Sequence, residues 1–119
     1  MSSLLAREIH EQPQVLQRFR RREGERVLQL GERIGRSRPV GVLIAARGSS
    51  DHVAIYAKYL LGQRLGVPVA LAAPSLVTVY GASLRLAGWL VVAISQSGAS
   101  PDVVAVLSAA RDQGSQTLA

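Results

Sequence analysis

Residues 41–50 read GVLIAARGSS, and their pattern indicates the fold class most clearly. Its first part, VLIAA at residues 42–46, is continuously apolar, which is typical of a strand covered on both faces of a parallel sheet. The turn RGSS follows at once, and apolar residues then recur at helical spacing until Gly66 and Pro68 supply a stop. A buried strand that leads through a tight turn into a helix is the repeating unit of a parallel α/β sheet.

The same unit recurs along the chain. Further strands are predicted at residues 67–72 and 89–94, and the second of them leads into a helix over residues 101–113. Ser100 is the predicted N-cap of that helix, and Pro101 occupies its first position. The pattern predicts an α/β fold with a three-layer αβα arrangement, in which a doubly wound parallel sheet has helices on both faces.

Two segments are less regular. Residues 74–86 show no clear period, and Ser75 is a candidate cap for a short helix that ends near Gly81. Residues 116–119 look like the opening of a fourth strand. Because a doubly wound domain rarely ends on a strand that has only begun, we expect this domain to be incomplete and the chain to be a fragment or a truncated product.

The chain divides into an N-terminal helical arm, residues 1–38, and the partial α/β domain, residues 39–119. Apolar positions in the arm predict two helices, the second over residues 23–34. We expect a turn or a new helix start at Pro13, since proline lacks an amide hydrogen and disfavours a helical conformation in the residue before it.

The formal charge of +6 comes mainly from the arm, which holds nine arginines against five acidic residues. Its run of Arg18, Arg20, Arg21 and Arg22 could form a basic face for nucleic acid. A solvated helix face, with arginines paired to nearby glutamates, explains the run better, because no aromatic or glycine-rich RNA-binding motif accompanies it. We therefore expect no nucleic-acid partner.

Composition excludes several classes of chemistry. The chain has no cysteine, which rules out disulfides, zinc-thiolate sites and a cysteine nucleophile. Its two histidines, His10 and His52, lack metal-ligand spacing, so we expect no metal and no cofactor. No apolar run approaches the ~18 residues of a membrane span, and no signal peptide is recognisable. We expect a cytoplasmic protein with no membrane partner.

Two loops rich in serine and glycine follow the first and third predicted strands and lead into helices. Ligands of open parallel sheets bind outside the carboxyl ends of strands, and helix N-termini offer free amides and partial positive charge. One such loop alone would be an ordinary turn with capping residues, whereas two on one sheet favour a phosphate site. The predicted phosphate-binding residues are Gly48, Ser49, Ser50, Ser95, Gln96, Ser97, Gly98 and Ser100.

Charged residues beside these loops have simpler explanations. Asp51 and Asp102 lie near predicted helix starts, where the helix dipole favours a carboxylate. His52 is expected to be a partly exposed helix residue, because only Asp51 is available to orient it. Lys58, the only lysine, lies in mid-helix, and no role is assigned to it.

The residues Ala46-Arg47-Gly48-Ser49-Ser50, together with Ile94-Ser95-Gln96-Ser97-Gly98, resemble the paired signature of SIS (sugar isomerase) domains. Glu8-Ile9-x-Glu11-Gln12-Pro13 resembles the segment before that domain in the isomerase half of glucosamine-fructose-6-phosphate aminotransferases and related sugar-phosphate deaminases. The resemblance implies a five-stranded αβα sandwich with flavodoxin-like strand order that forms a homodimer in the full-length parent. It also implies that the Ser-Gln-Ser-Gly loop and Ser100 grip a sugar phosphate, with help from Ser50.

The resemblance further implies the chemistry of the parent, an aldose-ketose isomerase or deaminase acting on amino-sugar phosphates such as glucosamine 6-phosphate. Ala99-Ser100 stands where the synthases carry Glu-Thr, which looks more similar to the deaminase or deglycase branch. The family's acid/base Glu, ring-opening His and Lys come from a second SIS domain and a C-terminal tail. We therefore expect no catalytic residue in this chain, which would supply the phosphate anchor.

Three other readings compete with this one. A sugar-phosphate sensor would pair the domain with a DNA-reading helix-turn-helix, for which the 38-residue arm is too short. A dinucleotide-binding oxidoreductase would need a G-x-G-x-x-G fingerprint after the first strand, and the sequence has none there. The third reading, a truncated and inactive remnant, stays open.

Overall fold

Parallel strands form a single sheet in the computed structural model, which describes residues 3–119. The strands of this described part are β1 (Val42–Ala46), β2 (Val69–Leu71), β3 (Leu90–Ile94) and β4 (Gln116–Leu118). Their order is β2-β1-β3-β4, and all neighbouring pairs run parallel. This confirms the α/β class, the flavodoxin-like order and the fourth strand expected from residues 116–119.

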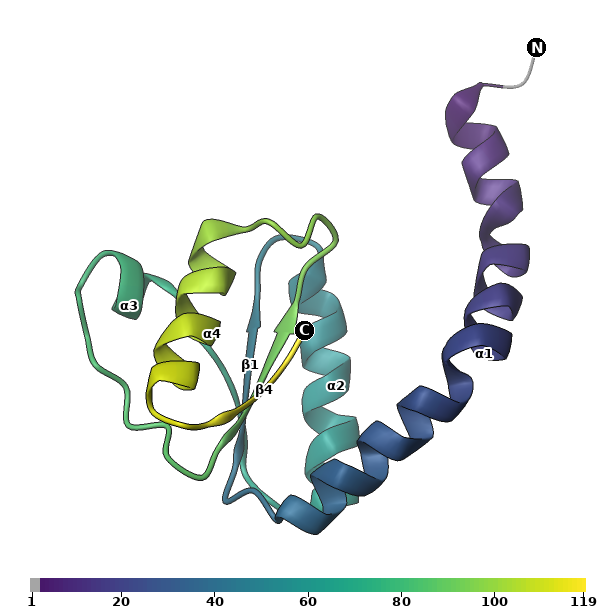
Figure 1. Ribbon diagram of the computed structural model, residues 1–119. Helices are drawn as coiled ribbons and strands as arrows, with labels where there is room; N and C mark the ends of the chain where they lie inside the picture. Colours follow the sequence, from purple (N-terminus) through teal and green to yellow (C-terminus); the bar gives the residue numbers. More distant parts are fainter. Residues whose placement is uncertain (1–2) are drawn as a thin grey trace. The chain divides into compact units, whose positions relative to one another are not determined.

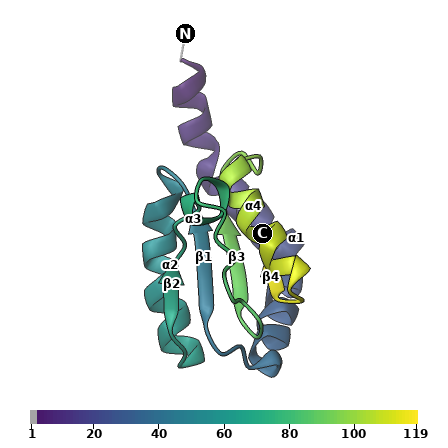
Figure 2. The ribbon, with the colours of Figure 1, turned by 90° about the vertical axis from the view of Figure 1, so that its left-hand side faces the viewer.

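Helices α2 (Ser50–Leu65) and α4 (Pro101–Asp112) lie on opposite faces of the sheet (Figures 1 and 2). All five residues of β1 are buried, as are the first three of β3, because both central strands are covered on both sides. The main core cluster joins alternate strand residues to the inner side of α4; its buried members are Leu43, Ala45, Leu86, Val91, Val103, Val106 and Ala110.

The packing of α2 agrees with the prediction in part. Of the apolar residues expected on one face of this helix, Ala57, Leu61 and Leu65 are half-buried beside the fully buried Ala54, whereas Val53, Tyr56 and Leu60 are exposed. A small side chain lets the helix backbone approach the sheet closely, so the larger side chains beside it stay outside the contact. Tyr56, Tyr59 and Tyr80 are exposed as well.

Helix α1 (Leu4–Ser37) is continuous, which corrects the prediction of two helices. Pro13 lies inside it and removes one backbone hydrogen bond, but the flanking residues are mostly good helix formers. None of the described side chains of α1 is buried. This helix forms a unit separate from Arg38–Ala119, so each is described by itself.

The arginine run of α1 does not pair as predicted. Ion pairs in the described part of this helix join Arg26 to Glu23 at 3.0 Å and Arg36 to Glu32 at 3.1 Å, and the run from Arg18 to Arg22 makes none. The partners follow helix geometry, since residues three and four apart face one another. No helix within residues 3–119 is long and apolar enough to cross a membrane.

The segment between β2 and β3 holds the short helix α3 (Ser75–Thr78), whose N-cap is Pro74 rather than the predicted Ser75. Side chains of the turn between α4 and β4 form hydrogen bonds with the backbone of this segment. Gln113 accepts a hydrogen bond from the Leu86 amide at 3.0 Å and donates to the Leu84 carbonyl at 2.6 Å. The hydroxyl of Ser115 donates to the Leu86 carbonyl oxygen.

Candidate functional site

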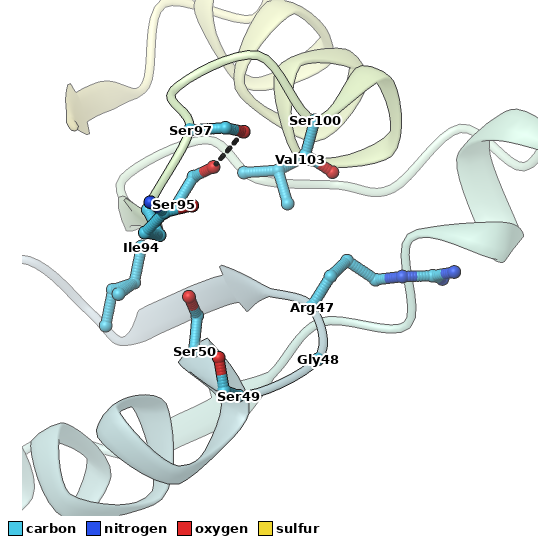
Figure 3. Close-up of a pocket in the computed structure, with 10 residues that line it drawn as sticks. Arg47, Gly48, Ser49, Ser50, Ile94, Ser95, Ser97, Ser100 and Val103 are labelled. Atoms are coloured by element: carbon cyan, nitrogen blue, oxygen red, sulfur yellow. Dashed lines mark hydrogen bonds between the residues drawn. The ribbon is translucent and has the colours of Figure 1, made fainter. Parts of the chain in front are cut away.

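A cavity of about 290 Å³ lies at the carboxyl ends of β1 and β3, between the loops that follow them. Figure 3 shows Ser49 and Ser50 on one side of it and Ser95, Ser97 and Ser100 on the other. The lining residues are Arg47, Gly48, Ser49, Ser50, Ile94, Ser95, Gln96, Ser97, Ser100 and Val103. Every predicted phosphate-binding residue except Gly98 is therefore among them.

The loop after β1 uses its amides within its own turn. The amides of residues 50–52 donate to the carbonyl oxygens of residues 47–49 at 3.1 to 3.3 Å. Gly48 has a φ of +61°, in the left-handed region that glycine adopts without strain. Within the described residues, the side chain of Ser49 makes no capping bond to α2. The first amides of α2 are therefore occupied, contrary to the expectation, and this loop offers its hydroxyls and the amides of Gly48 and Ser49, which make no hydrogen bond within the described residues.

The loop after β3 is held by its own serines. Oγ of Ser95 accepts from the Gly98 amide at 3.1 Å, and Oγ of Ser97 accepts from the Ala99 amide at 3.2 Å. The two hydroxyl oxygens lie 3.5 Å apart, so one of them can donate to the other. A hydroxyl that accepts from an amide still has its own proton to donate. At least one O–H of this pair is therefore left for an anion.

The start of α4 carries further unused donors. Ser100 is its N-cap and Pro101 its first residue, as predicted. Within residues 3–119, the amides of Asp102 and Val103 make no hydrogen bond, and the side chain of Ser100 makes none to its helix. A helix N-terminus with open amides is a favourable environment for a phosphate or carboxylate.

Charged side chains at the edge of the cavity form an ion pair that joins its two sides. Nη1 of Arg47, the residue after β1, lies 3.2 Å from Oδ2 of Asp102 in the first turn of α4. The side chain of Arg47 extends away from Ser49 and Ser50 (Figure 3). Arg47 is the charged residue of the lining, and the described part of the chain places no other there.

Arg47, Ile94 and Val103 were not among the predicted site residues. Their position could have indicated two of them, because Arg47 follows one predicted strand and Ile94 ends another, where ligands of parallel sheets bind. His52 is exposed and lies outside the lining, in agreement with the expectation of a solvated helix residue. No group of three or more His, Asp and Glu side chains gathers around a common point in residues 3–119, where a metal ion could be held.

Comparison with known proteins identifies relatives of this chain. The model of the SIS domain family matches residues 39–119. The glutamine-fructose-6-phosphate aminotransferase (isomerizing) of Halobacterium salinarum is 33% identical over 97% of this chain, which spans 20% of that enzyme. A crystal structure described as a "putative phosphosugar isomerase" from Silicibacter pomeroyi is 41% identical with a TM-score of 0.86; the match covers 93% of this chain and 34% of that one.

Proposed function

The chain belongs to the SIS domain family, and from this premise we propose that it binds a phosphorylated sugar by its phosphate, between the loops after β1 and β3. In this proposal residues 39–119 are the binding domain and residues 1–38 an arm outside the site. The phosphate-binding residues are Gly48, Ser49, Ser50, Ser95, Gln96, Ser97, Gly98 and Ser100.

One observation carries the proposal: hydroxyl and amide donors from two separate loops converge on one small cavity. The donors on the α4 side are the amide of Val103, a lining residue, and an O–H of the Ser95 and Ser97 pair. Ser49 faces them from the other loop (Figure 3). Several donors without acceptors of their own suit a phosphate, whose oxygens accept strong charge-assisted hydrogen bonds.

The finer proposal concerns the sugar and the reaction. The two relatives are named for isomerising phosphorylated sugars, and one of them for transferring an amino group to fructose 6-phosphate. We assign this chain an amino-sugar phosphate such as glucosamine 6-phosphate, within a parent that is an aldose-ketose isomerase or deaminase. Such a parent would move a proton between C1 and C2 by general acid/base catalysis while the phosphate anchors the substrate.

The chain's own part in that reaction is the anchor, and we assign no catalytic residue among these 119. Binding energy from a remote phosphate positions the reacting carbons and so contributes to catalysis without touching them. The anchor also explains how one domain could serve isomerases and deaminases alike, since it recognises the phosphate and not the reacting end of the sugar.

Isothermal titration calorimetry of the chain tests the proposal. Glucosamine 6-phosphate and fructose 6-phosphate should both bind, and unphosphorylated glucosamine should not. Equal binding of glucosamine and glucosamine 6-phosphate would show that the phosphate is not what the cavity recognises. A preference for the amino sugar over fructose 6-phosphate would support the finer proposal, and a preference for fructose 6-phosphate would count against it.

A further inference from the structure

We propose that Arg47 sets the phosphate affinity of the cavity by neutralising Asp102, so that it acts as a positioning residue and not as a ligand of the phosphate. This inference rests on the proposed function. It concerns the one ion pair that joins the loop after β1 to the helix after β3 within the described residues.

The geometry separates Arg47 from the donors of the cavity. Its guanidinium is engaged by Asp102 at 3.2 Å, and its side chain extends away from Ser49 and Ser50 (Figure 3). The donors that face one another across the cavity are serine hydroxyls and α4 amides. In this arrangement the arginine lies at the rim, and its nearest anionic partner is a carboxylate of the protein itself.

The ion pair between Arg47 and Asp102 changes the electrostatic environment of an anionic ligand. Asp102 carries a negative charge in the first turn of α4, beside the open amides of Asp102 and Val103 where a phosphate would bind. A carboxylate there is favourable for the helix but repels an anionic ligand. Its side chain is only 34% exposed, so solvent screens this repulsion incompletely. Arg47 cancels the charge and leaves the positive end of α4 to the phosphate.

The pair is poorly explained as a stabilising contact. The side chain of Arg47 is 56% exposed, and ion pairs at such positions add little to folding stability. Removing the arginine should therefore change ligand affinity while the thermal midpoint of unfolding hardly moves. Separate effects on affinity and stability distinguish a role in the site from a merely structural one.

A double-mutant cycle on the 119-residue chain tests the inference, with inorganic phosphate and glucosamine 6-phosphate as the ligands. Arg47→Ala should weaken binding about three- to fivefold, the upper part of the range that corresponds to losing one screened charge pair. Asp102→Asn should bind at least as tightly as wild type. The double variant Arg47→Ala/Asp102→Asn, which lacks both charges, should bind within about twofold of wild type, because the net charge beside the cavity is then unchanged.

The outcomes separate this inference from the function on which it rests. A double variant that binds as weakly as Arg47→Ala would make Arg47 a direct ligand and overturn the proposal, and so would unchanged affinity in Arg47→Ala. Arg47→Lys should restore most of the affinity, and failure to do so would count against neutralisation. Wild-type protein that binds neither ligand would overturn the proposed function itself. Amide NMR dispersion confirms folding of each variant, and Arg47→Gln replaces Arg47→Ala where the alanine variant does not fold.

Discussion

The amino and carboxyl ends of the sheet differ in what their polar groups do. At the amino end, the side chains of Gln113 and Ser115 form hydrogen bonds with the backbone of residues 84–86. The ring of Trp89 packs against Gly41. At the carboxyl end, the N-cap Ser100 leaves α4 uncapped, and first-turn amides stay open in the described chain. Satisfied groups stabilise a fold, whereas unsatisfied donors at a cavity invite a ligand. Changes at the two ends should therefore have separable effects.

The largest effect should come from the amino end. A Cβ added at Gly41 would lie 2.7 Å from ring atoms of Trp89, so Gly41→Ala forces the indole or the strand to move. We expect a loss of about 2 kcal/mol in the free energy of unfolding, as for other overpacked positions. Urea denaturation followed by circular dichroism measures it.

Gly62→Ala is the matched control in α2, because its nearest neighbour, a methyl of Val69, would lie at an ordinary 3.6 Å. It should be neutral or stabilise the protein by up to about 1 kcal/mol, since alanine favours the helix. Equal losses in the two variants would mean that the contact of Trp89 with Gly41 has no special part in stability.

The second effect belongs to the carboxyl end. Ser97→Ala removes the hydroxyl that holds the Ala99 amide and faces the cavity, so the Kd for glucosamine 6-phosphate should rise about tenfold. Calorimetry measures the change. Ser108→Ala, at an exposed position of α4 outside the lining, should leave the Kd unchanged. A Ser97→Ala variant with wild-type affinity would remove Ser97 from the site.

A third, smaller effect tests whether the amino end is independent of binding. Gln113→Ala leaves the part-buried Leu86 amide without its acceptor, which should lower the free energy of unfolding by about 1 kcal/mol. Thermal denaturation measures this loss, and the Kd for glucosamine 6-phosphate should stay at the wild-type value. Weakened binding in folded Gln113→Ala would show that the two ends are coupled.

The smallest effect compares the two loops of the site. Ser49→Ala removes a hydroxyl from the loop before α2, a helix whose first-turn amides already bond carbonyls of that loop, so the Kd should rise only about twofold. Isothermal titration calorimetry of Ser49→Ala and Ser97→Ala gives the ratio of their Kd values. A larger loss from Ser49→Ala than from Ser97→Ala would reverse the roles that the hydrogen bonds assign to the loops.

Much of the fold follows from short patterns. The continuous apolar run at residues 42–46 and the Ser100-Pro101 pair predict a buried strand and a helix start, and both are present. These signals are local, because burial on both faces and N-terminal proline each act within a few residues. The serine and glycine loops could also be placed at one edge of the sheet, because the carboxyl ends of parallel strands lie at the same edge.

The rest depends on contacts that no local pattern contains. The sequence shows an apolar period in α2, but only close packing decides that Ala54 faces the sheet and Tyr56 faces outward. Pro13 is a helix breaker by propensity, yet it costs α1 only one backbone bond. The pairing of Arg47 with Asp102 joins residues far apart in sequence, so it appears only once the strands lie side by side.

The most direct test of the central claim is an amide NMR titration of the uniformly labelled chain with glucosamine 6-phosphate, with glucosamine as the control ligand. We expect a dispersed spectrum in which only the phosphorylated sugar shifts the amide signals of residues 48–50, 95–100, 102 and 103, while those of residues 84–89 at the amino end do not shift. A dispersed spectrum in which the signals of the two loops do not respond, or respond equally to glucosamine, would contradict the proposed phosphate site.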